Sequence, residues 1–251
     1  MFGLAKSERA SMETYMNLAE YDGKYVQIKD IYGETFSGRA SYGNRDFLEC
    51  EYGGEGDGIF IEDFLLYNDQ IETIEEIIPH GTAELWTENL ILRRYRPEDA
   101  EQLYERFGTD PAMSKYSGWN PYATPEMAQE TVQEFIKSYE KNHSYSWVMD
   151  VDSVVVGTIG AYDYEDGRIE VDFSVDAGWQ GRGFATEALR EVLKYLTENE
   201  GISCVTAWCA EENIASRRVL EKAGMRFVRM EKCGLAVADR VYDKLIYEYV
   251  R

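Results

Sequence analysis

The sequence predicts an α/β (α+β) domain over about the C-terminal two thirds of the chain, preceded by a small β-barrel domain. Three observations predict this. The length of 251 residues exceeds that of an average single domain. Residues 24–78 form short β-type segments separated by glycine-bearing turns, whereas residues from about 84 onward alternate between helical and β-type patterns. Between them, Pro79-His80-Gly81 has the composition of a linker. We therefore predict domains at 1–80 and 81–251.

The composition limits the functions that the chain can have. Its formal net charge of −21 repels phosphate backbones, so nucleic acid is an unlikely partner. This acidity either keeps the protein soluble or attracts a basic substrate. No apolar run is long enough to span a membrane, and the N-terminus lacks the apolar core of a signal peptide, so we expect a cytoplasmic protein without membrane association. Four cysteines without a CxxC pair and two histidines make a metal site or a disulfide framework unlikely.

The N-terminal domain is predicted to contain one helix followed by five strands. Residues 7–20 suit a helix, and the strands are predicted at 24–31, 34–42, 46–52, 58–67 and 71–78. In this order the segment DGKYVQIKDIYGETFSGRASYGNRDFLECE resembles the Sm/LSm small-barrel family, over about residues 18–78. No Arg-Gly follows the fourth turn, and the segment EGDGIFIED there is acidic. This favours a docking or oligomerisation module, including a homo-oligomer, over an RNA-binding one.

The second domain begins with a predicted strand and two helices, and three strands follow. The strand is expected within 85–95, the helices at 97–108 and 123–142, and the further strands at 144–151, 154–164 and 168–175. A helix then follows a turn that contains Gly181 and Gly183, and its apolar residues recur at spacings that form one face. A further helix, 214–224, is expected to begin after Asn213 and to end at Gly224.

The glycine turn before the helix at 184 predicts an anion site. Without side chains at Gly181 and Gly183, the N–H groups of the helix N-terminus can approach a pyrophosphate closely. A Rossmann loop would need Gly or Ala where Thr186 stands, and the Gly-Lys-Ser/Thr of a Walker loop is absent. For these six residues alone, a glycine turn without a ligand remains the simpler interpretation.

The surrounding sequence resembles the GNAT superfamily of N-acetyltransferases. The loop Gln180, Gly181, Arg182, Gly183, Phe184, Ala185 matches the family's Q/R-x-x-G-x-G/A loop for the pyrophosphate of coenzyme A. The segments IEVDFSVDAGWQGRGFATE, EENIASRRVLEKAGMRFV and LWTENLILRRYRPEDAEQLYERF resemble signatures of its Rim-type ribosomal-protein acetyltransferase branch. The resemblance covers about residues 84–250. It implies the GNAT fold and transfer of an acetyl group from acetyl-CoA to a primary amine on a small molecule or a protein N-terminus. A non-catalytic acyl-CoA sensor is the alternative.

The resemblance also implies roles for individual residues. Backbone donors from Phe173, Ser174 and Val175 would polarise the thioester carbonyl. Glu170 is the first choice as general base, acting through water, although an acidic strand residue facing solvent is an equal alternative. Ser216 would protonate the thiolate, and Asn213 would contact the pantetheine amide while capping its helix.

Three further residues are candidates for the acceptor site. Asp172 shares a strand face with Glu170. Tyr162, on the preceding strand, is an alternative proton donor, as is Tyr164, although strand tyrosines more often serve packing. Trp119 lies between the first two helices of the domain, a region that walls the acceptor site in this family, and could equally anchor its loop.

Overall fold

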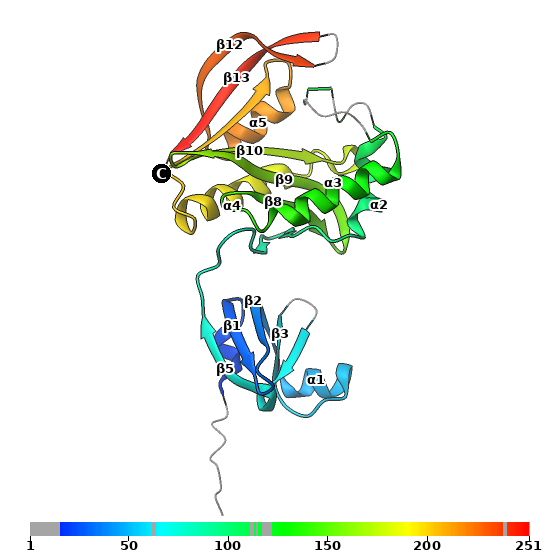
Figure 1. Cartoon of the computed structure of the whole chain (residues 1–251), viewed down its shortest axis with the longest axis vertical. Helices are drawn as coiled ribbons and strands as arrows, with labels where there is room; N and C mark the ends of the chain where they lie inside the picture. The colour runs from blue at the N-terminus through cyan, green and yellow to red at the C-terminus, as the bar shows by residue number, and fades with distance from the viewer. Residues whose placement is uncertain are drawn as a thin grey trace, which may run out of the picture. The chain divides into compact units, whose positions relative to one another are not determined.

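The computed structural model describes residues 16–61, 64–110, 113, 115–116, 122–237 and 240–250. The chain divides into two compact units, Met1–Ile78 and Pro79–Arg251 (Figure 1). Trp119 and the first part of the predicted helix at 7–20 lie outside the described residues. Among the helices that are described, none combines the length and the apolar character that crossing a membrane requires.

The N-terminal unit is built on a five-stranded antiparallel sheet. The strands, in the spatial order β4-β3-β2-β1-β5, are β1 (Tyr25–Asp30), β2 (Thr35–Gly43), β3 (Gly58–Ile61), β4 (Phe64–Tyr67) and β5 (Ile71–Glu76). One 3₁₀ turn, Leu18–Tyr21, precedes β1, and a second, Asn68–Gln70, connects β4 to β5. Eight buried apolar residues form the core: Leu18, Val26, Ile28, Ala40, Ile59, Ile61, Leu66 and Ile71. The order places β4 and β5 at opposite edges, so the closed barrel that we predicted is not shown.

The strand predicted at 46–52 is wrong, because this segment forms the helix α1 (Arg45–Tyr52). The side chain of Asn44 caps the helix by accepting a hydrogen bond from the Phe47 N–H at 2.9 Å. Gly53 ends it in the left-handed conformation, with φ of 69°. Both residues lie in the glycine-bearing turns that the sequence predicts between strands. The fifth strand comes instead from 58–67, which supplies both β3 and β4.

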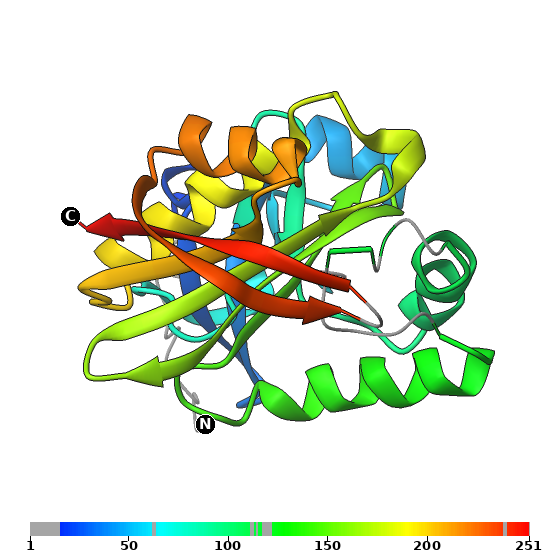
Figure 2. The ribbon, with the colours of Figure 1, turned by 90° about the horizontal axis from the view of Figure 1, so that it is seen from above.

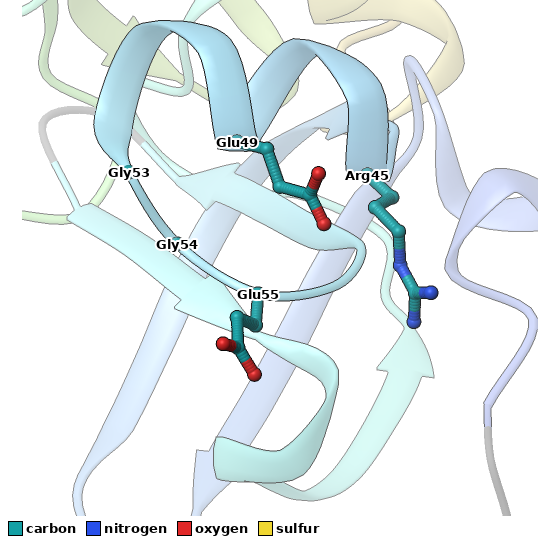
Figure 3. A pocket seen from close by; sticks show the side chains of 5 residues that line it. All are labelled: Arg45, Glu49, Gly53, Gly54 and Glu55. Atoms are coloured by element: carbon teal, nitrogen blue, oxygen red, sulfur yellow. The ribbon is translucent and has the colours of Figure 1, made fainter.

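A surface recess lies along α1 and the loop that follows it, and it is lined by Arg45, Glu49, Gly53, Gly54 and Glu55. Figure 3 shows Arg45 and Glu49 projecting from the helix and Glu55 from the loop that follows it. A Cβ atom at Gly54 would lie 1.9 Å from the hydroxyl of Tyr67, so close packing explains this glycine. The recess has none of the features predicted for the reaction, which belong to the second unit.

The second unit contains an eight-stranded sheet in the order β12-β13-β11-β10-β9-β8-β7-β6. Its strands are β6 (Leu85–Trp86), β7 (Ile91–Arg93), β8 (Tyr145–Val151), β9 (Val154–Glu165), β10 (Arg168–Val175), β11 (Cys204–Ala210), β12 (Arg226–Val237) and β13 (Arg240–Val250). The pair β10–β11 is parallel, and the other pairs are antiparallel. The single strand predicted within 85–95 is in fact the hairpin β6–β7, because the turn Thr87–Leu90 folds the chain back through a backbone hydrogen bond of 3.0 Å.

Helices cover both faces of this sheet (Figure 2). One face packs against α4 (Phe184–Glu198) and α5 (Ile214–Lys222). The apolar stripe predicted for α4 is buried there through Ala188, Leu189, Val192, Leu193 and Leu196. The other face packs against α2 (Asp99–Leu103), a π-helical turn (Tyr104–Gly108) and α3 (Pro125–Ser138).

A buried ionic cluster joins β7 and β8 to α2. The Arg93 guanidinium donates two hydrogen bonds of 2.9 and 2.8 Å to Asp99 and one of 2.8 Å to Asp150. These carboxylates hold the pKa of Arg93 above its ordinary value, although burial opposes this. The cluster fixes the start of α2 on the sheet face that α3 also covers.

Candidate active site

The centre of the large sheet is split. Strands β10 and β11 pair through three residues only, and their last pair is Glu170 with Thr206. From Val171 to Val175, β10 continues to pair with β9 on its other side. Because backbone groups alternate in direction along a strand, part of those in Val171–Val175 face the opening between β10 and β11. Phe173, Ser174 and Val175, predicted to donate to the thioester carbonyl, therefore lie on the open edge.

The glycine loop connects this open edge to α4. Asp176 accepts a hydrogen bond from the Gly178 N–H at 2.7 Å and forms a 3.4 Å ion pair with Arg106. Next along the chain, the Gln180 side-chain amide donates to the Val175 carbonyl at 3.0 Å. These contacts fix the loop to the end of β10.

Gly181 and Gly183 adopt φ values of +79° and +93°, and Gly183 is the N-cap of α4. At both positions a Cβ atom would meet nothing within 4 Å, so packing does not require glycine there. The positive φ favours glycine, and the open space leaves the N-terminal N–H groups of α4 accessible. Arg182 stacks its guanidinium 4.4 Å from the ring of Trp179. The arrangement suits a phosphate group, which is the ligand that the sequence predicted.

The second signature lies at the N-terminus of α5. Asn213 is the N-cap, and its side-chain oxygen accepts a hydrogen bond from the Ser216 N–H at 3.1 Å. The predicted cap is therefore confirmed. The Ser216 hydroxyl is half-buried and interacts with Cys209 of β11. Burial raises the pKa of the Cys209 thiol to about 11, so this thiol stays protonated at neutral pH.

Three acidic or phenolic candidates share the face of the sheet that α3 covers. Ile169 and Val171 point into the core beneath α4, so Glu170 and Asp172 project from the opposite face. Tyr162 of β9 pairs with Glu170. The Glu170 carboxylate accepts a hydrogen bond from the Trp208 indole N–H at 2.8 Å.

Asp172 and Tyr162 line a recess between this sheet face and α3. Its lining residues are Tyr95, Glu134, Phe135, Ser138, Ser144, Tyr145, Ser146, Thr158, Ile159, Gly160, Ala161, Tyr162 and Asp172. Burial and the nearby Asp172 and Glu170 raise the pKa of Tyr162, which therefore keeps its proton at neutral pH. By contrast, Tyr164 is not among the residues that line the recess, and its ring stacks on that of His143 with the two ring centroids 3.8 Å apart.

Sequence reasoning missed Trp208, Gly160 and Glu134. Trp208 reaches Glu170 only because β11, far along the chain, lies parallel to β10. Glu187, in the first turn of α4, accepts two hydrogen bonds from Asn89, one of 2.8 Å from the Asn89 backbone N–H and one of 3.1 Å from the Asn89 side chain. That carboxylate therefore fastens α4 to the β6–β7 turn.

Comparison with known proteins agrees with this geometry. Residues 89–226 match the family model described as an acetyltransferase (GNAT) domain. The chain is 27% identical over 171 residues to the uncharacterized N-acetyltransferase YoaA of Bacillus subtilis (strain 168), a match that covers 66% of this chain and 96% of YoaA. It is 28% identical over 140 residues to the uncharacterized N-acetyltransferase p20 of Bacillus licheniformis, covering 54% of this chain and 78% of p20.

Solved structures share the fold. The RimL ribosomal L7/L12 alpha-N-protein acetyltransferase in complex with coenzyme A superposes with a TM-score of 0.62 and 17% identity, over 70% of this chain and 98% of RimL. The microcin C7 self-immunity acetyltransferase MccE, in complex with acetyl-CoA and AMP, gives a TM-score of 0.63 and 14% identity, over 69% of this chain and 98% of MccE.

Proposed function

Because the chain belongs to the GNAT acetyltransferase family, and so is an acetyl-CoA-dependent N-acetyltransferase, we propose that it acetylates a primary amine by direct attack on the thioester. The acceptor is a small molecule or a protein N-terminus. One observation carries the proposal. The open edge of β10 runs directly into a glycine loop at the N-terminus of α4, so one continuous surface offers backbone groups first and an anion site next.

Acetyl-CoA, the co-substrate, is held along this surface. The loop Gln180, Gly181, Arg182, Gly183, Phe184 and Ala185 receives the pyrophosphate, and Phe173, Ser174 and Val175 offer backbone groups to the pantetheine arm and the thioester carbonyl. Asn213 contacts the pantetheine amide. Its side-chain oxygen is already used in capping α5, which leaves its NH₂ group available as a donor.

Acetyl transfer also requires that protons move. An amine must lose a proton before it attacks, and the departing thiolate must gain one. Glu170 and Asp172 are the carboxylates on the acceptor face, and the sequence favours Glu170 as the proton acceptor. Ser216 is the proposed donor to the thiolate, with Tyr162 as the alternative because its phenol stays protonated.

The acidity of the chain fits a cationic acceptor. RimL, one structural neighbour, is described as an alpha-N-protein acetyltransferase of ribosomal L7/L12, which makes a protein N-terminus a reasonable acceptor to test here. Polyamines and aminoglycosides carry amines of the same charge. Trp119 belongs to the proposed acceptor region on sequence grounds alone.

We propose that the N-terminal domain, predicted at 1–80, is an Sm-like docking or oligomerisation module without RNA binding, and that the GNAT domain spans 81–251. The five-stranded antiparallel sheet of the N-terminal unit supports an all-antiparallel β module, and the acidity of the chain argues against an RNA partner. A non-catalytic sensor that binds acyl-CoA and docks a partner through this unit is the alternative.

Product analysis tests the acceptor. The full-length protein is incubated with acetyl-CoA and, separately, with N-terminal peptides, polyamines or aminoglycosides, and the products are identified by mass spectrometry. Acetylation confined to one amine class supports the proposal and identifies that class. Acetylation of hydroxyl groups instead of amines would contradict it.

A further inference from the structure

The recess under α3 has a one-sided charge. Of its lining residues, Glu134 on α3 and Asp172 on β10 are acidic, and none is basic. Aromatic and hydroxyl side chains make up much of the remaining wall. A recess of this composition favours an ammonium group carried on a short apolar chain, because the carboxylates attract the charge and the rings pack against the chain.

Asp172 lies where this recess meets the open centre of the sheet. It stands two residues beyond Glu170, the last residue of β10 that pairs with β11. Opposite it on β9 is Gly160, where a Cβ atom would lie 3.2 Å from the Asp172 Oδ1. The absence of a side chain on β9 therefore leaves room for the carboxylate between the strand and the recess.

Glu170 is held differently. The Trp208 indole N–H binds one of its oxygens, and the Lys244 ammonium lies 4.7 Å from the same indole ring. Glu170 is not among the residues that line the recess, whereas Asp172 is. The two carboxylates therefore have separate positions, although they share one strand face.

We propose that Asp172 is the residue that accepts the proton of the acceptor ammonium in this recess, and that Glu170, positioned by Trp208, contributes negative charge beside it. The inference rests on the proposed function and refines it. The ammonium gives one proton to Asp172. The nitrogen lone pair then forms the N–C bond as the C–S bond of the thioester breaks. Ser216, the proposed donor, gives its hydroxyl proton to the departing thiolate, and the second proton of the nitrogen restores that hydroxyl.

The electrostatics support this assignment. The side chain of Asp172 is exposed toward the recess, but the protein atoms around its carboxyl group, together with the charge of Glu170, raise its pKa to about 6, while backbone groups of Gly160 and Asp172 oppose the shift. A base with a pKa near the working pH is effective. The other titratable groups that line the recess are Glu134, Tyr95, Tyr145 and Tyr162, and Glu170 lies beside Asp172 on the same strand face. The three tyrosines have raised pKa values and so do not titrate near pH 6.

The pH dependence of turnover tests the assignment. With n-butylamine as an unhindered probe and saturating acetyl-CoA, thiol release by the wild type should show an acid limb near pH 6. Asp172→Asn should lower kcat/KM at pH 7.5 by about 10²-fold to 10⁴-fold and lose that limb, which is the usual size of a general-base effect. Glu130→Gln removes the same charge at an exposed position on α3, and it should retain both the wild-type kcat/KM and the acid limb. An acid limb that persists in Asp172→Asn would overturn the assignment.

Two further measurements keep the result decisive. Gly160→Ala crowds the Asp172 carboxylate without changing any charge, so it should also reduce kcat/KM while acetyl-CoA affinity is retained. If n-butylamine supports no turnover, carboxyl ¹³C NMR replaces the kinetics. A resonance that titrates near pH 6, moves on addition of n-butylammonium and is missing in Asp172→Asn supports the inference, and its absence from the wild type refutes it. Calorimetry that finds no acetyl-CoA binding would instead reject the proposed function.

Discussion

Gly183→Glu should weaken acetyl-CoA binding because it places a negative charge at the proposed pyrophosphate site. Gly183 caps α4 with φ of +93°, is exposed, and has no atom within 4 Å of a Cβ position. Gly183→Glu and Gly183→Gln therefore introduce side chains of nearly equal size into open space. Both share the strain of a positive φ, which costs on the order of 1–3 kcal/mol. The comparison between them isolates the added charge.

The expected size follows from Coulomb's law. At roughly 5 Å from a phosphate, one unit of charge interacts by about 0.8 kcal/mol in bulk water and about 3 kcal/mol at the dielectric constant typical of a protein surface. Because position 183 is exposed, we expect about 1–2 kcal/mol, or roughly a 5-fold to 30-fold larger Kd for Gly183→Glu than for Gly183→Gln.

Isothermal titration calorimetry with acetyl-CoA measures this ratio. Repeating the titration at higher salt should reduce the difference, since screening acts on the charge alone. Circular dichroism checks that both variants retain the helix. Equal dissociation constants for the two folded variants would show that the pyrophosphate does not bind at the N-terminus of α4.

Further predictions concern stability. Arg93→Met leaves the carboxylates of Asp99 and Asp150 buried without their cation, so urea denaturation should show a loss of about 3–5 kcal/mol; a loss below 1 kcal/mol would contradict this role. Asn213→Ala removes the α5 cap and should lower the free energy of unfolding by about 1 kcal/mol in the same assay. If Asn213 contacts acetyl-CoA, the variant should also have a larger Kd for it. An unchanged midpoint of urea denaturation would exclude the cap as a source of stability. The raised pKa of Asp172 means that its ionisation destabilises the folded state, so the wild type should lose stability relative to Asp172→Asn as the pH rises from about 4 to about 6. Asp172→Asn should therefore have a higher Tm than the wild type at pH 7 but not at pH 4. The opposite order of Tm values would refute the raised pKa.

Local sequence patterns predicted the parts of the site that are themselves local. The two glycines, the apolar stripe of α4 and the Asn213 cap each depend on residues a few positions apart, and the structure contains all three elements. The segment at 46–52 was misinterpreted for the same local reason. Its alternating apolar residues resemble a strand, but Asn44 and Gly53 also satisfy the two ends of a helix.

The remaining features arise from contacts between distant segments. The parallel pairing of β10 with β11 stops at Glu170, and no pattern within either strand specifies where two strands separate. The contact of Trp208 with Glu170 depends on that pairing. The recess at Asp172 likewise requires α3 to lie over β9, where Gly160 has no side chain. The roles proposed for these residues remain predictions.

Amine-dependent thiol release from acetyl-CoA is the most direct test of catalysis by this chain. Purified full-length protein is mixed with acetyl-CoA and each amine class in turn, and free thiol is followed over many turnovers. Catalytic transfer predicts continuous release that depends on one amine class and falls in Ser216→Ala and Asp172→Asn. Tight acetyl-CoA binding without release from any amine would contradict catalysis and favour the acyl-CoA sensor.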